Sequence, residues 1–477
     1  MLDLRSFLEK SKEEGDLLEL QGVDWNIELG TLTELLAEKG GPLLLFDKFK
    51  GYPAGYRVAT NLYTTVRRFA IAIGMPPDTD KMEIIKRWRA LDFKPVKPVE
   101  VKTGPVMENV HIGGDVNLYK FPVPRYHEHD GGRYIGTGVV VIMMDPDTGY
   151  INAGVQRVML HDEKTVGLYI SPGKHNAIIR KKYWSKGESC PVVMDFGPAP
   201  ILWLSAASHV SWGTSEFEWA GYLANEPQKV IPGEITGLPI PAHSEIAIEG
   251  EYLPPEVETR MEGPFGEWTG YYGGGERDEP VVRVKAVYHR NNPLLAGAPP
   301  IKPPHYAFAV PVRTTPLLWN ALEKAGISGI KGVWDHEAGG GRMIVIISLK
   351  QSHGGHAMQA GLAAIGSHAG GYMAKLVIVV DDDIDPTDLN EVLWAVVTRA
   401  NFENSASILK GCWGTRLDPA LPPEKRERDD LTHSAMIIDA CRPFYWRDRF
   451  PQVNKASEEL RAKVIEKWRD KIELLRG

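Results

Sequence analysis

Two glutamates flank a tight turn in residues 261–272, MEGPFGEWTGYY. Glu262 and Glu267 lie at either end of a Gly-Pro-Phe-Gly segment, which can fix a turn that aims both side chains into one cleft. Upstream, Arg157 ends the segment NAGVQR, and its planar guanidinium can bind a carboxylate through two hydrogen bonds. Beside one arginine, one carboxylate can hold the guanidinium while the other, partly desolvated, carries a proton. These three residues predict an enzyme that acts on a carboxylate.

The same residues also have a simpler interpretation. An arginine is more often part of a surface ion pair, although few charges surround Arg157 in the sequence. Two glutamates in a loop rich in glycine can be ordinary solvated acids. The spacing of Glu262 and Glu267 alone leaves both interpretations open.

Asn152, His175 and Glu216 form a looser set of polar side chains. An amide oxygen, an imidazole and a carboxylate suit Mn²⁺ or Mg²⁺ better than a structural Zn²⁺, and such an ion could bridge a phosphate. From composition alone, three scattered side chains of these types are more often a coincidence than a site.

Other candidate motifs carry less chemistry. His353 and His356 have HxxH spacing, which alone is usually not a metal site. The acidic run 381–385 could bind a cation, but it is better explained by solvation of a strand end and capping of the next helix. The glycines 339–341 predict a mobile loop. The chain has no GxGxxG after a strand, no GxxxxGK[ST] and no GxSxG, so simple dinucleotide, P-loop and α/β-hydrolase functions lack support.

The composition is that of an ordinary globular protein, with 43% hydrophobic and 25% charged residues. A chain of 477 residues exceeds a single core, so two or three domains are expected. The net charge of -7 argues against nucleic acid as the main partner, and no run approaches the ~18 apolar residues of a membrane span. Three cysteines without a CxxC, and a charged amphipathic start in place of a signal peptide, favour the reducing cytoplasm.

Arg157 is expected to lie on a strand within a domain of short strands, which follows a mixed N-terminal region. Residues 1–90 alternate helical and strand patterns, with Leu4, Phe7 and Leu8 on a helix face and a buried strand over 43–46. From residue 136, short strands separated by glycine and proline turns predict a barrel or sandwich-like domain. These strands are expected at 138–144, 150–160, 166–170, 192–196, 245–249 and 281–288.

Alternating helices and strands after residue 310 predict an α/β domain. A helix is expected over 315–324, with strands over 343–349 and 375–380. Asp385, as N-cap, and Pro386, at the first helical position, are expected to start a helix that ends at Arg399. The tail carries an apolar stripe that needs a surface to cover, on this or another subunit. The stripe consists of Leu460, Val464, Trp468 and Ile472.

The chain resembles the UbiD family of decarboxylases, which use prenylated flavin mononucleotide (prFMN). EGPFGE, residues 262–267, is the most specific match, and NAGVQR (152–157) and DDDIDP (381–386) add to it. Further matches extend over most of the chain, at 118–124, 127–132, 134–142, 172–175, 214–221, 241–246 and 393–399.

The resemblance implies a role for each site residue. Arg157, Glu262 and Glu267 fall on the family's Glu-Arg-Glu catalytic network, in which the arginine orients the carboxylate, Glu262 holds the arginine and Glu267 protonates the carbon once CO₂ has left. The resemblance also implies a divalent ion, Mn²⁺ or Mg²⁺, that ties down the flavin phosphate through Asn152, His175 and Glu216, with K⁺ as a further candidate ion. The implied cofactor-binding residues are Asn152, Ala153, Gly154, Val155, Gln156, Arg157, Lys174, His175 and Glu216.

The implied fold is mixed α+β and UbiD-like. It comprises an N-terminal α/β region (1–115), a split β-barrel domain that binds prFMN (116–310), a C-terminal α/β oligomerisation domain reached through a linker helix (311–450), and a C-terminal helix (451–477). The implied partners are a small carboxylic acid and CO₂, a flavin prenyltransferase that supplies the cofactor, and further copies of the chain in a homodimer or homohexamer. Neither nucleic acid nor a membrane is expected as a partner.

These expectations predict a reversible non-oxidative decarboxylase of an aromatic, heteroaromatic or α,β-unsaturated acid, with prFMN as electron sink. Two other classes stay open. A metal-dependent hydrolase would use Glu267 to activate a metal-bound water and would need no flavin. A non-catalytic scaffold would tolerate replacement of Arg157 and both glutamates. The acid itself is not assigned by the sequence, but its pocket walls are expected at His305, Tyr306, Arg313 and Trp334.

Two features of the sequence fit the resemblance poorly. Asn152 and Arg157 are five residues apart, so a regular strand directs them to opposite faces. Either Gly154 marks a bulge, or the two residues act on opposite sides of the flavin. In addition, many family members have a lysine near the position of Ala435 that meets the flavin phosphate, and the residues here that could compensate are Arg442 and Lys410.

Overall fold

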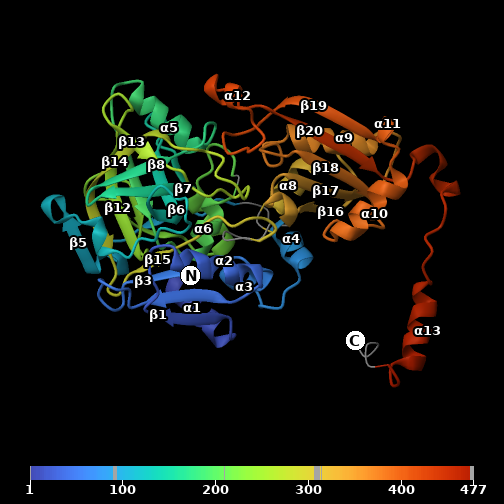
Figure 1. Ribbon diagram of the computed structural model, residues 1–477, viewed down its shortest axis with the longest axis horizontal. Coiled ribbons are helices and arrows are strands. Elements are labelled where there is room, and N and C mark those ends of the chain that lie inside the picture. The colour runs from blue at the N-terminus through green and yellow to red at the C-terminus, as the bar shows by residue number, and fades with distance from the viewer. Residues whose placement is uncertain (1, 90–93, 209, 306–311, 313, 473–477) are drawn as a thin grey trace.

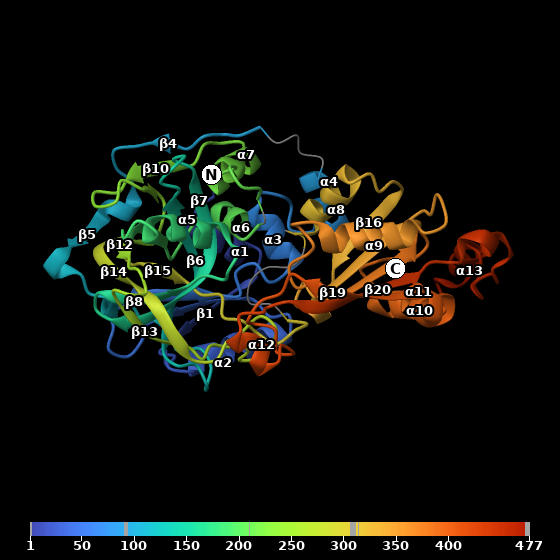
Figure 2. The ribbon, with the colours of Figure 1, turned by 90° about the horizontal axis from the view of Figure 1, so that it is seen from above.

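The computed structural model describes residues 2–89, 94–208, 210–305, 312 and 314–472. A β-barrel with an N-terminal α/β layer forms one part of the molecule, and a sheet with helices on both faces forms the other (Figures 1 and 2). The last helix that the structure describes, α13 (Glu458–Trp468), stands apart from both (Figure 1). Among the described residues, no helix is long and apolar enough to span a membrane.

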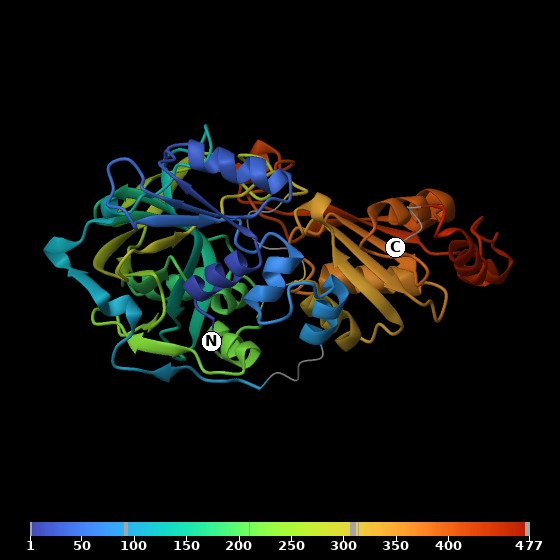
Figure 3. The ribbon, with the colours of Figure 1, turned by 90° about the horizontal axis from the view of Figure 1, so that it is seen from below.

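The N-terminal region is a small mixed sheet with helices. Helix α1 begins after Asp3, whose side chain accepts a hydrogen bond from the backbone N–H of Ser6 at 2.9 Å. Leu4, Phe7 and Leu8 are buried, which confirms the predicted helix face. Figure 3 shows this region, in blue, lying against the barrel. Its elements are α1 (Leu4–Glu13), β1 (Leu17–Gln21), α2 (Glu28–Glu38), β2 (Leu43–Asp47), β3 (Arg57–Thr60), α3 (Val66–Ala72) and α4 (Lys81–Arg89), and β15 (Leu294–Ala296) completes the sheet beside β3.

The central sheet closes on itself. Strands follow one another in the order β12-β9-β6-β7-β8-β14, and β14 also pairs with β12, so that six antiparallel strands form a barrel. This closure confirms the predicted barrel. Its strands are β6 (Arg133–Met144), β7 (Ile151–Asp162), β8 (Thr165–Tyr169), β9 (Cys190–Asp195), β12 (Ile246–Tyr252) and β14 (Arg277–His289), with β5 (Asn109–Ile112) and β13 (Thr259–Glu262) added at β14.

Helices and a small sheet surround the barrel. Side chains of β6 alternate between two hydrophobic clusters, with Val140 and Ile142 in one and Val139 and Val141 in the other, as the two-residue period of a strand requires. The surrounding elements are α5 (His175–Trp184), α6 (Pro200–Ala206), α7 (Glu216–Ala224), β4 (Val99–Glu100), β10 (Lys229–Pro232) and β11 (Pro239–Pro241).

Strand β7 has no bulge at Gly154. Its pairing with β6 is regular from Ile151 to Gln156, so that prediction is wrong. The register shifts lie between β6 Tyr134 and Val139 instead. There, Gly138 lies so close to β15 that an added Cβ would be 2.7 Å from the carbonyl oxygen of Ala296, which favours an irregular backbone in β6.

The C-terminal domain is an α/β sheet in the order β16-β17-β18-β20-β19, as predicted. The pairs β17–β18 and β18–β20 are parallel and both edges are antiparallel. Helices α8 and α9 cover one face, and α10 packs on the other. The elements are α8 (Thr315–Lys324), β16 (Ile330–Asp335), β17 (Ile344–Leu349), α9 (His356–Gly366), β18 (Leu376–Asp381), α10 (Leu389–Arg399), α11 (Phe402–Ser405), β19 (Ala406–Cys412), α12 (Pro423–Glu427) and β20 (His433–Ala440).

Helix α10 begins three residues later than predicted. Its N-cap is Asp388, which accepts hydrogen bonds from the backbone N–H groups of Asn390 at 2.9 Å and Glu391 at 3.3 Å. Asp385 instead accepts from the backbone N–H of Thr387 at 2.8 Å, in the turn before the helix. The predicted Asp385 cap is wrong because a second acidic residue stands closer to the apolar face that the helix buries.

The expected linker helix between the two parts of the molecule stays a prediction. Residues 297–305, which leave the barrel, are not helical, and the next residues lie largely outside the described part of the chain. Helix α4 of the N-terminal region contacts the C-terminal domain. Arg89 at its end lies over the ring of Trp319 in α8 at 4.0 Å and forms an ion pair with Glu323 at 2.5 Å.

Candidate active site

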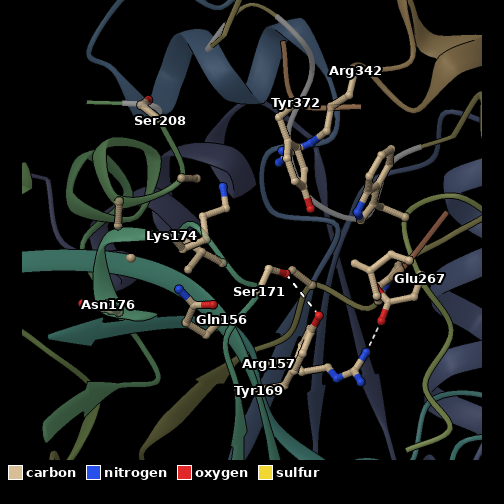
Figure 4. A pocket seen from close by; sticks show the side chains of 18 of the residues that line it. Gln156, Arg157, Tyr169, Ser171, Lys174, Asn176, Ser208, Glu267, Arg342 and Tyr372 are labelled. Carbon is tan, nitrogen blue, oxygen red and sulfur yellow. Dashed lines mark hydrogen bonds and ion pairs between the residues drawn. The ribbon is translucent and has the colours of Figure 1, made fainter. Parts of the chain in front are cut away.

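A cavity of about 230 Å³ lies where the barrel meets the C-terminal domain (Figure 4). Strand β7 forms one wall, and side chains of the C-terminal domain, among them Tyr372 and Trp413, form another. Arg157 and Glu267 both line this cavity. Each predicted cofactor-binding residue also lines it except Ala153, which is fully buried behind it.

Arg157 joins the two predicted glutamates. Its Nε donates to Glu262 Oε1 at 2.7 Å and its Nη2 donates to Glu262 Oε2 at 2.7 Å, a bidentate pair. Its Nη1 forms an ion pair with Glu267. Glu262 is fully buried, and Glu267 is buried at the cavity. The solvated-loop interpretation of these glutamates is therefore wrong.

The turn between the glutamates is packed rather than mobile. Gly263 has a φ of +88°, and an added Cβ would meet the carbonyl oxygen of Gly275 at 2.4 Å, so a glycine is required there. Phe265 places its ring 4.2 Å from the ring of Tyr134, and the two rings of Phe265 and Tyr169 lie 5.2 and 4.7 Å from the Arg157 guanidinium. Aromatic packing thus fixes both the turn and the arginine.

Burial disfavours the charged forms of both Glu267 and Arg157. Burial raises the pKa of Glu267 to about 7, although Arg157 opposes the shift. Burial also works against the charge on Arg157, but Glu267 and Glu262 together raise the pKa of this guanidinium above its usual value. Glu267 can therefore hold a proton near neutral pH beside an arginine that stays charged.

Asn152, His175 and Glu216 line the same cavity. Asn152 Oδ1 lies 3.1 Å from His175 Nδ1, and Glu216 Oε2 accepts from the backbone N–H of Ala153 at 2.8 Å. His175 is the first residue of α5 and Glu216 the first of α7, so both lie at helix N-termini, where anions are favoured. Burial lowers the pKa of His175 to about 4 and raises the pKa of Glu216 to about 8.

Asn176 determines which atom of Asn152 faces the histidine. The Asn152 Nδ2 group donates to Asn176 Oδ1 at 2.8 Å, and Asn176 Nδ2 donates to the carbonyl oxygen of Val141 at 3.0 Å. The Asn152 carbonyl oxygen is thereby directed at His175. An amide oxygen, a neutral imidazole and a buried carboxylate fit a divalent cation such as Mn²⁺ or Mg²⁺. Within the described part of the chain, no three His, Cys, Asp or Glu residues are grouped so that they could hold a metal ion. A metal site here would therefore need the Asn152 amide oxygen as a ligand.

Three family models match successive parts of the chain. They describe the N-terminal domain (residues 8–88), the Rift-related domain (97–303) and the C-terminal domain (309–440) of 3-octaprenyl-4-hydroxybenzoate carboxy-lyase, UbiD. The chain belongs to the UbiD family. This family of carboxy-lyases is the one that the sequence resembles, and the class of enzyme is confirmed.

Characterised relatives cover nearly the whole chain. A phenolic acid decarboxylase from Bacillus subtilis is 32% identical over 92% of both chains, and a pyrrole-2-carboxylic acid decarboxylase from Pseudomonas aeruginosa is 33% identical over 98% of both. The UbiD-class enzyme HmfF from Pelotomaculum thermopropionicum, in complex with FMN, is 29% identical, with a TM-score of 0.83 over 96% of this chain and 98% of its own. An evolved dimeric form of HmfF in complex with prFMN is 27% identical, with a TM-score of 0.82 over 96% and 98%. The UbiD-like fold is confirmed.

Arg442 and Lys410, the two residues that could compensate for the lysine missing near Ala435, do not line the cavity. Ala435 is buried in β20, Lys410 is exposed on β19, and neither lines the cavity. Arg442 binds Asp383 instead. Lys174, at the start of α5 and next to His175, also lines the cavity, with its Nζ 5.1 Å from the ring of Tyr372.

The expected substrate walls are only partly correct. His305 lines the cavity. Trp334 does not, because it is buried in the C-terminal domain, where its Nε1 donates to Glu337 at 2.9 Å. Tyr306 and Arg313 lie outside the described residues.

Sequence reasoning missed the side chains that the C-terminal domain contributes. These side chains come from loops of the C-terminal domain, and no short sequence motif indicates that the loops lie near β7. The glycines before Arg342 were a possible signal, but they were interpreted only as a mobile loop. An added Cβ on Gly340 would lie 3.0 Å from the carbonyl oxygen of Trp268, so this loop approaches the turn beside Glu267. The missed residues are Arg342, His368, Tyr372, Trp413 and Leu417.

Proposed function

We propose that this UbiD-family protein is a reversible, non-oxidative decarboxylase of an aromatic, heteroaromatic or α,β-unsaturated carboxylic acid, and that it uses prFMN. The bidentate pair between Arg157 and Glu262, with Glu267 on the same guanidinium, carries this proposal. Relatives that act on phenolic acids and on pyrrole-2-carboxylate support the substrate class, and neighbours that hold FMN and prFMN support the cofactor.

The end of the cavity near β7 suits the phosphate and ring of a flavin. Asn152, His175 and Glu216 would hold Mn²⁺, or Mg²⁺ in its place, with K⁺ as a further candidate, and Lys174 would add a positive charge for the phosphate. The wall 152–157 would lie along the cofactor. When bound, prFMN supplies an electron sink for the carbon that loses CO₂.

The residues of the chain divide the remaining work. Arg157 orients the substrate carboxylate, and Glu262 fixes Arg157 by occupying its Nε and Nη2. Protonation of Glu267 weakens its ion pair with Arg157 Nη1, so that this edge of the guanidinium becomes available to the substrate. Glu267 then gives its proton to the carbon after CO₂ leaves.

The decisive experiment is production of the protein together with a flavin prenyltransferase, the partner that must supply the cofactor. A UV-visible spectrum and the mass of the bound species should identify prFMN, and CO₂ release should follow with pyrrole-2-carboxylate or a phenolic acid. A protein that stays colourless after anaerobic reconstitution with prFMN and Mn²⁺ would contradict the proposal. Hydrolysis supported by metal alone would then favour the hydrolase, and an inert protein would favour the scaffold.

We also place the protein in the cytoplasm as a homo-oligomer. Its three cysteines are free, as a reducing compartment requires, and Cys190 and Cys441 are buried. Residues 451–472 are exposed throughout, including the apolar stripe, whose Leu460, Val464 and Trp468 lie on α13 (Glu458–Trp468) and whose Ile472 follows it. Helix α10 exposes Leu393, Trp394 and Val397, the last by 71%. Two unpaired apolar surfaces in the same chain favour packing of α13 on a second copy, as a homodimer or within a homohexamer.

A further inference from the structure

The turn that ends at Glu267 rests on residues 127–132, a segment just before β6 that belongs to the family resemblance. The backbone N–H of Gly131 donates to the carbonyl oxygen of Pro264 at 2.8 Å. A Cβ added to Gly131 would lie 1.9 Å from the carbonyl oxygen of Gly263, so the two backbones touch and only a glycine fits. No residue of this segment lines the cavity. The segment therefore acts on the site through the turn.

The contact next to Glu267 is made by Asp130, whose side chain is buried. Its Oδ1 accepts a hydrogen bond from the backbone N–H of Gly266 at 3.2 Å, and its Oδ2 accepts from the backbone N–H of His127 at 3.0 Å. The His127 Nδ1 lies 3.5 Å from Oδ2, and among the residues that the structure describes no lysine or arginine forms an ion pair with this carboxylate. A buried carboxylate without such a cation depends on its N–H donors, and hydrogen bonds to a charged acceptor are about twice as strong as neutral ones. Asp130 therefore fixes the N–H of Gly266.

This hydrogen bond lies one residue before the proposed proton donor, because Glu267 follows Gly266 directly. The chain after Glu267 is held by its own turn. The N–H of Glu267 donates to the carbonyl oxygen of Tyr271 at 3.0 Å, and the carbonyl oxygen of Glu267 accepts from the N–H of Gly270 at 2.8 Å. Asp130 supplies the support on the preceding side, so the two together fix the direction in which the Glu267 side chain leaves the backbone.

The opposite end of the turn is held without Asp130. Glu262 is the last residue of β13, pairs with Arg277 of β14 in the sheet and binds Arg157 through two contacts of 2.7 Å. Loss of the Asp130 carboxylate should therefore displace Glu267 and leave Arg157 in place. A displacement of about 1 Å in a reacting group can lower a rate by about 10²-fold.

We propose that Asp130 is a positioning residue for the protonation step, and that it holds the Glu267 carboxyl at the point where the new C–H bond forms. This inference rests on the proposed decarboxylase function. In that reaction CO₂ leaves, and the electron pair of the broken C–C bond stays with the substrate carbon and the electron sink. The proton of Glu267 then forms the C–H bond, and the carboxylate that remains regains a proton from solvent. Arg157 serves the first step, so Asp130 matters mainly for the second.

The test separates the two steps in the protein loaded with prFMN, with pyrrole-2-carboxylate and a phenolic acid as substrates. In the first turnover, Asp130→Asn should release CO₂ within about 2-fold of the wild-type rate but form the protonated product about 10- to 100-fold more slowly. The reason is that an amide has one oxygen and cannot accept from both N–H groups. The solvent isotope effect of D₂O on kcat should rise because protonation becomes the slow step, and the content of bound flavin should not change.

Asp195→Asn is the matched control. Asp195 is also fully buried and accepts from a backbone N–H, that of Gly197 at 3.1 Å, but it ends β9 outside the cavity. This control should leave both steps within about 2-fold of the wild type.

Gly266→Ala is a second variant, which keeps the Asp130 carboxylate. The added Cβ would lie 3.3 Å from His127 Nδ1, so it should press the turn away from its support. Product formation should slow relative to CO₂ release as in Asp130→Asn, by a smaller factor. If Asp130→Asn does not fold, this variant decides, and a wild-type ratio of the two rates in Gly266→Ala would then overturn the inference.

Hydrogen exchange of the full-length chain tests the contact without turnover. Mass spectrometry of the peptide 262–272 should show faster exchange at the Gly266 amide in Asp130→Asn and wild-type exchange in Asp195→Asn. Unchanged exchange in Asp130→Asn would overturn the inference, and so would an equal loss of both steps, which would make Asp130 a general support of the site. Absence of wild-type turnover with every acid would count against the proposed function, and the exchange of Gly266 would still decide whether Asp130 holds the turn.

Discussion

Glu262 binds two nitrogens of Arg157, whereas Glu267 binds one. The Glu262 contacts are both 2.7 Å long and fully buried, and Glu267 meets the remaining Nη1 at the surface of the cavity. A carboxylate that occupies two positions of the fork serves as an anchor. Glu267 occupies a single position of the fork, and burial favours its protonated form. It can therefore leave the arginine and return to it.

This asymmetry predicts different consequences for the two glutamates. Glu267→Gln should lower turnover by about 10²- to 10⁴-fold because the amide cannot deliver a proton, while the bound flavin remains. The measurement is CO₂ release together with flavin content from the visible spectrum. A variant with full activity would rule out Glu267 as the proton donor.

Glu262→Ala should instead act on stability. It leaves the buried Arg157 with Glu267 as its single carboxylate partner, and breaking a buried ion pair costs about 3–5 kcal/mol in the free energy of unfolding. Glu83→Ala is the matched control, because Glu83 pairs with Arg87 on the exposed face of α4 and should cost less than about 1 kcal/mol. Urea denaturation of both variants gives the comparison, and equal losses would contradict the anchor role.

The pKa of Glu267, raised to about 7 by burial, predicts the pH dependence of turnover. The donor must be protonated, so kcat should be constant below this pKa and should fall about tenfold per pH unit above it. The check is kcat for CO₂ release at saturating acid over the neutral pH range. The residual rate of Glu267→Gln should not follow this profile, and a wild-type rate that rises with pH would exclude Glu267 as the acid.

The sequence predicted the cavity residues on the barrel better than those that the C-terminal domain contributes. Glu262 and Glu267 could be recognised because a glycine- and proline-rich turn lies between them, and the structure brings them to Arg157. The cap of α10 was misplaced because Asp385 and Asp388 are both good N-caps, and only the packed helix shows which one is used. Approach of the loop at Arg342 depends on tertiary packing, which leaves no periodicity or spacing in the sequence.

The proposed metal donors can be tested without replacing any of them. Asn176→Ala removes the hydrogen bond that directs the Asn152 oxygen at His175, and loss of such a supporting contact typically lowers metal affinity about 10- to 100-fold. Mn²⁺ titration followed by electron paramagnetic resonance measures this affinity. Asn320→Ala is the control, since Asn320 binds the backbone oxygen of Arg89 far from these donors. Unchanged Mn²⁺ affinity in Asn176→Ala would contradict the proposed site.

The exposed tail predicts an effect on assembly. Leu460 and Val464 of α13 are 52% and 44% exposed, so the double variant Leu460→Asp with Val464→Asp should leave the fold of the chain intact but weaken its association with a second copy. Glu466→Lys is the control, because the helical period places it on the opposite side of α13. Sedimentation should give a lower mass for the double variant and the wild-type mass for the control. Val397→Asp on α10 should reproduce the effect of the double variant if that surface receives the tail helix, and a wild-type mass for all three would show that α13 does not hold the oligomer together.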